Sequence, residues 1–168
     1  MQLLVVRHAR AKDRDEFAAS GKPDSARPLT KKGIRKMRAA ARGLRALVPS
    51  IELLVSSPLR RAVQTAEIIA EVFEKSEYVE REELKPGASP QPLIEWLARR
   101  KADGIVCIVG HEPVLSELLA ELVGDQSKAP AALKKGSAAL VKIDGAIVAS
   151  GGRLQWYHTA KKLASHVA

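Results

Sequence analysis

The order of apolar segments along the chain is the feature that most restricts its fold. Short runs rich in Val, Leu and Ile alternate with longer segments whose apolar residues recur every three or four positions. The short runs are typical of buried strands, and the longer pattern is typical of amphipathic helices. Residues 3–6, 51–55 and 105–109 form three such runs, and each precedes a helix-like segment. Because strands that alternate with helices build parallel sheets covered by helices, the sequence predicts an α/β fold.

The expected helices have recognisable ends. Thr30 is a suitable N-cap for the first long helix, and Pro49 ends it. Ser57 supplies a capping hydroxyl for the second helix, which Pro58 opens. Four helices are expected in all, over residues 31–48, from residue 57 to about 73, from 90 to about 101 and from 113 to about 123.

The end of the chain has a different pattern. Residues 138–143 and 147–149 are joined by Asp144-Gly145, a strong turn dipeptide, and they predict a β-hairpin. Residues 153–157 predict a further strand. The hairpin places an antiparallel edge strand on a mainly parallel sheet. We therefore expect a three-layer α/β/α sandwich in a single domain over residues 1–168, with a long functional loop over residues 9–29.

Charged and nucleophilic side chains follow the three predicted strands directly. Arg7 and His8 come after the first strand, Ser57–Arg61 after the second, and Gly110–Pro113 after the third. The carboxyl ends of parallel strands meet at one edge of a sheet, where α/β proteins place their binding sites. Two histidines and several arginines are therefore expected to face one hollow.

These segments carry a resemblance to a known family. Four motifs occur in order, namely Val6-Arg7-His8-Ala9, residues 27–33 (RPLTKKG), residues 57–66 (SPLRRAVQTA) and Gly110-His111-Glu112-Pro113. In these motifs the chain resembles the histidine phosphatase superfamily, which is phosphoglycerate mutase-like in fold. Within it, the chain is similar to the compact phosphohistidine phosphatases of the SixA type. The resemblance implies that His8 takes the phosphoryl group while Arg7, Arg61 and His111 hold its charge, with Arg27 as a fourth phosphate-binding cation.

The chemistry of these side chains suits the implied roles. A neutral imidazole is a nucleophile at neutral pH, so His8 can form a covalent phosphohistidine that water then hydrolyses. Guanidinium groups present permanently charged forks that match phosphate oxygens. No cofactor is expected, and no metal, because the sequence has neither a His-x-x-x-His pair nor a cysteine pair.

The sequence leaves the proton donor open. Glu83 lies near the place where larger relatives carry their acid, and Asp24 precedes Arg27 by three residues. Either carboxylate is a candidate. A phosphohistidine substrate reduces the need for a strong acid, because its leaving imidazole departs neutral when its other nitrogen is protonated. The segment Ala9–Lys12 also lacks the hydroxyl that many relatives place there for phosphate, so that contact is missing or supplied elsewhere.

The charge distribution points to an anionic partner. Residues 1–45 carry 13 Lys and Arg against 4 acids, and this excess equals the net charge of +9 for the whole chain. Such a field attracts phosphorylated substrates or an acidic protein face. With only six Phe, Tyr and Trp residues, the sequence shows no base-stacking platform, so no nucleic acid partner is expected.

Two enzymatic functions that share one covalent mechanism fit these features, and so does one non-enzymatic function. The first is hydrolysis of phosphohistidine on a protein, such as a signalling phosphotransfer domain. The second is hydrolysis of small phosphate esters or anhydrides. The rival is a non-catalytic phosphate-binding module.

No run approaches the roughly 20 apolar residues of a membrane span, so a cytoplasmic protein without a membrane partner is expected. The oligomeric state is not indicated. Arg60, His158 and His166 are interpreted as residues outside the site.

Overall fold

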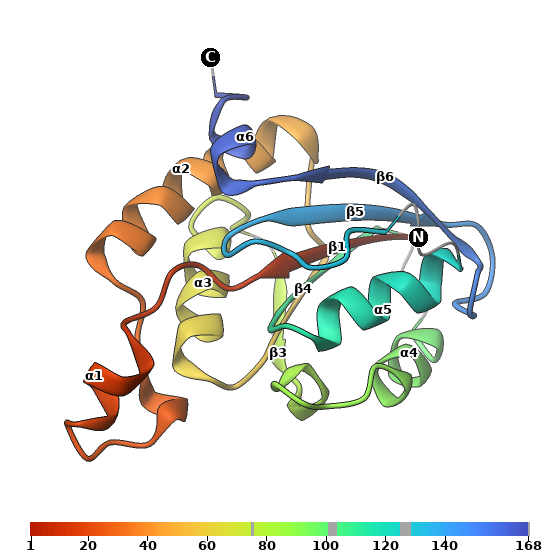
Figure 1. The fold of residues 1–168 in the computed structure, drawn as a ribbon. Helices are drawn as coiled ribbons and strands as arrows, with labels where there is room; N and C mark the ends of the chain where they lie inside the picture. Colours follow the sequence, from red (N-terminus) through yellow and green to blue (C-terminus); the bar gives the residue numbers. More distant parts are fainter. Residues whose placement is uncertain (75, 101–103, 125–128, 168) are drawn as a thin grey trace.

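A computed structural model describes residues 1–74, 76–100, 104–124 and 129–167. Six strands form one sheet, in the order β3-β2-β4-β1-β5-β6 (Figure 1). The strands are β1 (Gln2–Arg7), β2 (Leu53–Ser56), β3 (Glu77–Glu80), β4 (Ile105–Gly110), β5 (Ala138–Ile143) and β6 (Gly152–His158). The neighbours among β1 to β4 pair in parallel, whereas β5 runs antiparallel to both β1 and β6.

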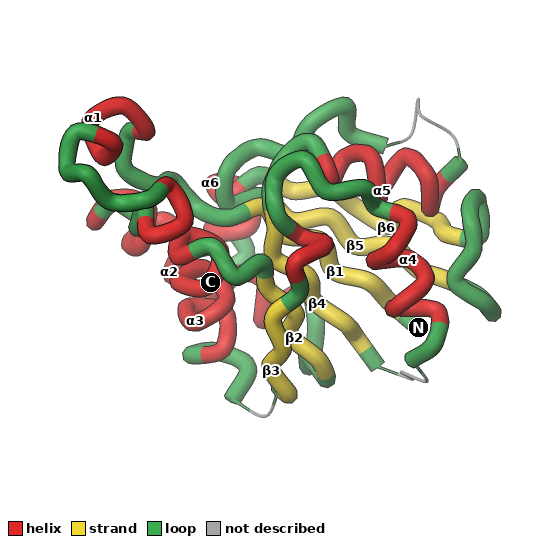
Figure 2. Tube along the Cα trace, turned by 90° about the horizontal axis from the view of Figure 1, so that it is seen from below, coloured by secondary structure: helices red, strands yellow, loops and turns green. Residues whose placement is uncertain are grey.

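Helices cover both faces of this sheet (Figure 2). The helical elements are α1 (Arg14–Ala18), α2 (Lys31–Leu47), α3 (Arg60–Ala70), α4 (Gln91–Ala98), α5 (Val114–Val123) and α6 (Ala160–Ala164), with short 3₁₀ turns at Asp24–Ala26 and Glu82–Leu84. One apolar cluster joins α2, α3 and α6 to one face, and a second joins α4 and α5 to the other. The expected three-layer α/β/α arrangement is confirmed.

The central strand β1 shows why its run is continuously apolar. Leu4 and Val6 belong to the cluster under α2 and α3, whereas Leu3 and Val5 belong to the cluster under α4 and α5. Side chains alternate between the two faces of a strand, and here both faces are buried. β1 and its neighbour β4 therefore hold the residues that follow them rigidly at one edge of the sheet.

The predicted hairpin needs correction. Residues 147–149 are not a strand, and β5 pairs instead with β6 across a longer connection that contains Asp144-Gly145. The antiparallel strand is consequently β5, which lies one place in from the edge, whereas β6 forms the edge itself. A hydrogen bond from Ser150 N to Glu121 O attaches this connection to α5.

Other boundaries differ by a few residues. The second helix begins at Arg60 with Leu59 as its N-cap, so the prediction that Ser57 caps this helix is wrong. The helix opened by Pro90 ends at Ala98, and its predicted end at residue 101 lies outside the described residues. The sequence did not predict β3, α1 or α6. Within the described part of the chain, no helix has the length and apolar character needed to cross a membrane.

Candidate active site

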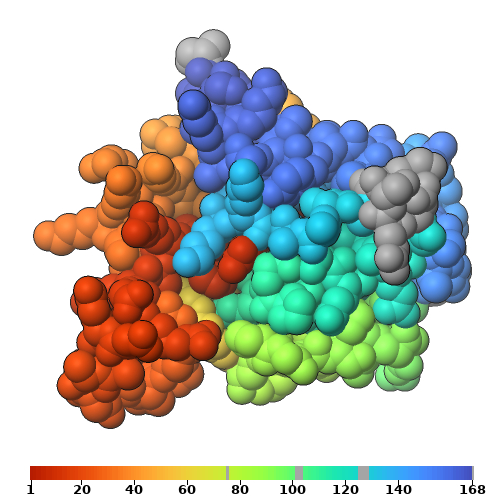
Figure 3. Space-filling model, viewed as in Figure 1, coloured from red at the N-terminus to blue at the C-terminus, as the bar shows by residue number. Residues whose placement is uncertain are grey.

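The three strand-end segments meet around one cavity of about 1010 Å³. Arg7 and His8 reach it from the end of β1, Arg61 from the first turn of α3 after β2, and His111 from the end of β4. The convergence that the sequence predicted is therefore present. Figure 3 shows the surface hollowed between the red N-terminal segment and the teal and light-blue segments that face it.

The cavity wall is strongly cationic. Among the described residues that line it are eight cations and three carboxylates. The cations are Arg7, Arg10, Lys12, Arg14, Lys22, Arg27, Arg61 and Lys135, and the carboxylates are Asp13, Glu16 and Glu112. Positive walls of this kind concentrate anions at the mouth of a cavity. The long loop predicted over residues 9–29, which contains α1, supplies most of these groups.

A hydrogen bond fixes the tautomer of His8. Its Nδ1 lies 2.7 Å from the carbonyl oxygen of Ala9, which can only accept, so Nδ1 carries the proton. Nε2 then keeps its lone pair. Burial lowers the pKa of His8 to about 3; the Ala9 carbonyl opposes this shift, and the charges of Arg61, Arg7 and Lys135 add to it. At neutral pH the imidazole is therefore uncharged, with a lone pair on Nε2.

His111 lies beside His8, with 4.9 Å between the ring centroids. Its Nε2 is 2.9 Å from Ser57 Oγ, and its Nδ1 is buried with no hydrogen-bond partner among the described residues. Burial lowers its pKa to about 2, with contributions from His8, Arg61 and Arg7 against that of Asp24. Ser57 Oγ also accepts a 3.3 Å hydrogen bond from Leu59 N, so this hydroxyl supports both the turn before α3 and His111.

The segment before β5 encloses Arg7. Arg7 Nη1 donates to Leu133 O at 2.6 Å, and Arg7 N donates to Ser137 O at 3.1 Å. Gly136 N in turn donates to the carbonyl oxygens of Arg7 and His8, at 3.1 Å each. These contacts place Lys135 on the cavity wall, a position that the sequence did not predict. The position of Lys135 could have been predicted from the strand order. A strand that runs antiparallel to the others begins at the edge of the sheet where the others end, and Lys135 lies just before such a strand.

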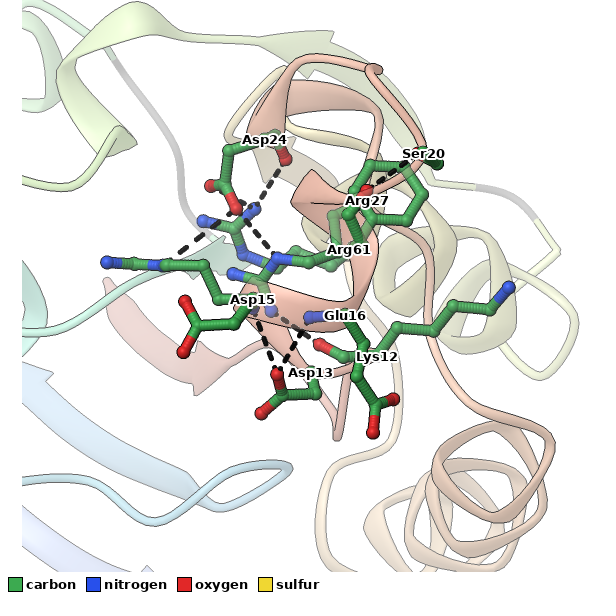
Figure 4. Close-up of polar contacts among 10 residues, drawn as sticks. Lys12, Asp13, Asp15, Glu16, Ser20, Asp24, Arg27 and Arg61 are labelled. Atoms are coloured by element: carbon green, nitrogen blue, oxygen red, sulfur yellow. Dashed lines mark hydrogen bonds and ion pairs between the residues drawn. The ribbon is translucent and has the colours of Figure 1, made fainter.

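Asp24 holds two of the arginines (Figure 4). Arg27 Nε donates to Asp24 Oδ1 at 2.7 Å, and Arg61 Nη1 donates to Asp24 Oδ2 at 3.1 Å and to its backbone oxygen at 3.2 Å. The arginine side chains are almost fully buried, with Arg61 only 2% exposed. Burial opposes ionisation of Asp24, but the hydrogen bond from Arg27 and the charges of both arginines lower its pKa overall.

Glu83 stands apart from the cavity. It is absent from the lining residues, and Arg81 pairs with both of its carboxylate oxygens. Burial raises its pKa, but a backbone hydrogen bond and Arg81 outweigh that effect and lower it. Of the two candidate proton donors, only Asp24 contacts the arginines of the site, and the lowered pKa of both carboxyls keeps them ionised at neutral pH.

The third family-like motif also fixes the backbone around His8. Thr65 Oγ1 accepts from Ala9 N at 3.0 Å and donates to Arg61 O at 2.7 Å. Gln64 Oε1 accepts from Leu29 N at 2.8 Å. No sequence pattern assigned a function to Thr65 or Gln64, yet these residues connect α3 to both ends of the long loop.

Arg60, His158 and His166 lie outside the cavity, whereas Thr30 both caps α2 and lines the cavity. Thr30 caps α2 by accepting from Gly33 N at 2.9 Å, and Arg60 is exposed and pairs with Glu67. His158 stacks between Trp156 and His166, and neither histidine lines the cavity. The described residues contain no group of three or more His, Cys, Asp or Glu side chains placed to hold a metal ion.

We expect the two buried histidines to make folding stability sensitive to mild acid. In the unfolded chain a histidine gains its proton near pH 6.5, whereas His8 stays neutral in the folded state down to about pH 3. Stability present above pH 6.5 is therefore lost as the pH falls through this window, by about 2 kcal/mol per histidine between pH 6.5 and 5. Urea unfolding at pH 7.5 and 5.0, without phosphate, measures the loss. His8→Gln and His111→Gln should each reduce it, and an unchanged loss in both variants would contradict this expectation.

Comparisons with known proteins agree with this geometry. The profile of the histidine phosphatase superfamily (branch 1) matches residues 3–86. An uncharacterised protein of Picosynechococcus sp. is 37% identical over 119 residues, which are 70% of each chain. The phosphohistidine phosphatase SixA of Escherichia coli is 30% identical over 125 residues, which are 73% of this chain and 74% of that protein.

Solved structures share the same fold. The protein histidine phosphatase SixA complexed with tungstate superposes with a TM-score of 0.80 and 27% identity, covering 97% of this chain and 99% of that one. A phosphoserine phosphatase of Entamoeba histolytica gives a TM-score of 0.68 over 99% of both chains, but at 16% identity it shows the fold alone. The profile match, the identity to SixA and the strand-end motifs agree, and the chain belongs to the histidine phosphatase superfamily, branch 1.

Proposed function

We propose that this protein is a phosphatase that hydrolyses phosphohistidine on another protein through a covalent phosphohistidine on His8. Membership of the superfamily supports phosphatase activity in general. The hydrogen bond from His8 Nδ1 to Ala9 O carries the assignment of the nucleophile, because it leaves the Nε2 lone pair available within the cationic cavity. Arg7, Arg61 and His111 line the same cavity.

The proposed reaction has two steps. His8 Nε2 attacks phosphorus in line, the new N–P bond forms, and the bond from phosphorus to the substrate imidazole breaks with its electron pair on the departing nitrogen. Water then attacks the phosphorus of the enzyme phosphohistidine, His8 leaves as a neutral imidazole, and the water protons pass to inorganic phosphate and solvent. His8 returns to its starting protonation state, and the route uses no metal.

Unpaired donors in the site support an oxyanion as its ligand. Arg7 Nε, Arg61 Nε and His111 Nδ1 are buried and lack hydrogen-bond partners among the described residues. Unpaired buried donors are unfavourable unless a ligand satisfies them. A proton on His111 Nδ1, with Ser57 donating to Nε2, would give a third donor toward phosphate. The tungstate bound by the related SixA structure, a tetrahedral oxyanion like phosphate, is consistent with this role.

The state of the carboxyls favours phosphohistidine over alcohol esters. Asp24 and Glu83 both have lowered pKa values, so neither holds a proton for a leaving alkoxide at neutral pH. An imidazole that is already protonated on its other nitrogen leaves without such help. General acid catalysis contributes about 10²–10⁴-fold where it operates, so its absence penalises esters selectively.

A substrate panel tests this proposal. We expect kcat/KM on a phosphohistidine-bearing phosphotransfer domain to exceed that on sugar phosphates, whose alkoxide leaving group needs a proton, by about 10²-fold or more. Equal or better turnover of sugar phosphates or nucleotides would instead assign the second candidate, a small-molecule phosphatase with the same covalent intermediate. Phosphate binding without turnover of any substrate would indicate a non-catalytic module.

A further inference from the structure

A line of cations covers the solvent side of α2. Lys31, Arg35, Arg38, Arg42 and Arg45 are spaced alternately by four and three residues, which places them along one side of the helix. We name these five residues the α2 stripe. All five are exposed, and the opposite side of the helix packs into the core. At 1.5 Å per residue the stripe is about 21 Å long, and α2 contains no acidic residue.

The stripe borders a shallow groove. A hollow of about 300 Å³ is lined by Ile34 and by four stripe residues, Lys31, Arg35, Arg38 and Arg42. Arg38 pairs with Glu71, with 3.0 Å between Nη2 and Oε1. Arg45 donates to Pro49 O and lies over the Phe73 ring. Within the described residues no ion pair involves Lys31, Arg35 or Arg42, so these three cations are available to a partner.

This arrangement works against the stability of the helix itself. Lys31 and Arg35 are like charges four residues apart, as are Arg38 and Arg42, and each such pair destabilises the helix. Lys31 and Lys32 also place positive charge in the first turn, where the helix dipole favours acids. Residues that lower the stability of their own helix are expected at functional surfaces.

The stripe begins at the mouth of the catalytic cavity. Thr30, the N-cap of α2, lines that cavity, and its backbone N donates to Arg10 O at 3.0 Å. Gly33 packs so closely here that a Cβ would lie 2.2 Å from the same oxygen. The first turn of α2 is thus fixed against a cavity-lining segment. Figure 3 shows the orange α2 region beside the red segment at the hollow.

We infer that the α2 stripe docks an acidic surface of the phosphorylated protein whose phosphohistidine enters the cavity. This inference rests on the proposed function, since it adds the kind of partner surface to that substrate. A protein that inserts one side chain at the cavity mouth brings its neighbouring surface over the adjoining helix. Acidic groups there would pair with Lys31, Arg35 and Arg42. An acidic protein fits better than single-stranded nucleic acid because no aromatic side chain lines the groove for base stacking.

The double variant Arg35→Glu/Arg42→Glu tests the stripe without changing any residue that lines the catalytic cavity. The probes are a phosphotransfer domain of net negative charge and a short phosphohistidine peptide without acidic residues. At low ionic strength we expect kcat/KM on the domain to fall about 10-fold or more, and the difference to shrink with added salt. Turnover of the peptide should stay within about 2-fold of wild type, which also shows that the variant is folded.

Lys161→Glu/Lys162→Glu is the matched control, because it reverses the same amount of charge on exposed residues of α6. We expect it to retain wild-type kcat/KM on the acidic domain. The docking inference would be overturned by equal losses of kcat/KM in both double variants, or by no loss in Arg35→Glu/Arg42→Glu. In either case, hydrolysis of the phosphohistidine probes by the wild type would still support the proposed function. Failure of the wild type to hydrolyse either phosphohistidine probe would overturn both.

A nucleic-acid role for the stripe has its own signature. Anisotropy of a labelled DNA duplex would then report tight binding that falls steeply with salt and is lost in Arg35→Glu/Arg42→Glu. We expect only weak duplex binding, equal in the two double variants. Tight, stripe-dependent duplex binding would overturn the assignment to an acidic protein surface.

Discussion

Replacing His8 with Ala should abolish the covalent intermediate and lower turnover by about 10⁴-fold or more, since the proposed chemistry passes through this one nitrogen. His8 is 6% exposed, and its Nε2 lone pair is the proposed nucleophile. Incubation with ³²P-labelled phosphoramidate should label the wild type with phosphate that is lost in acid and retained in base. The same incubation should leave His8→Ala unlabelled.

The matched control is His158→Ala. His158 is a partly buried histidine that stacks on Trp156 and His166 and does not line the cavity. We expect this variant to be labelled and to turn over substrate as the wild type does. Acid-labile phosphate on His8→Ala would contradict the proposed nucleophile. If His158→Ala also fails to become labelled, the result for His8→Ala reflects general damage to the fold.

The core of the candidate site could be predicted because it depends on local patterns. β1, β2 and β4 are apolar runs that pair in parallel. Their carboxyl ends therefore meet at one edge of the sheet, independently of the loop conformations. Arg7 and His8 lie at the end of β1, His111 follows β4, and Arg61 lies in the first turn of α3 after β2. Strand register then fixes their neighbourhood: Arg7 lies opposite Gly110, one residue before His111.

What the sequence missed depends on contacts between distant segments. β3 is largely exposed and polar, so it lacks the apolar run that marks the inner strands. Lys135 reaches the cavity only because Gly136 and Ser137 are hydrogen-bonded to Arg7 and His8. Asp24 was proposed as an acid from its position in the chain, and only the fold shows it ion-paired with Arg61, 37 residues away. No local pattern encodes such pairings.

Arg61→Ala should lower kcat by about 10²–10³-fold, the loss of about 3–4 kcal/mol that follows removal of one donor to a transition-state oxyanion. Arg61 is 2% exposed, and its Nε has no partner among the described residues. Its other contact is with Asp24, which also holds Arg27. The variant should therefore lower Tm as well as activity, so a second substitution is needed to separate the two effects.

Arg61→Lys keeps the positive charge beside Asp24 but lacks the guanidinium fork. We expect Tm near that of the wild type and a kcat still reduced by about 10²-fold, because a lysine ammonium does not reproduce bidentate contacts to phosphate oxygens. Steady-state kinetics on the phosphohistidine peptide, with thermal unfolding in parallel, measure both quantities. A kcat restored to the wild-type value in Arg61→Lys would mean that charge alone is required at this position.

Arg60, the residue before Arg61 in the same helix, supplies the control. It is exposed and pairs with Glu67 at 3.3 Å, a surface contact of a kind that contributes about 0–1 kcal/mol. Arg60→Ala removes the same charge from the chain as Arg61→Ala, yet it leaves the cavity lining unchanged. Activity within about 2-fold of wild type is expected. Comparable losses at both positions would mean that the general positive field, rather than the buried guanidinium of Arg61, sets the rate.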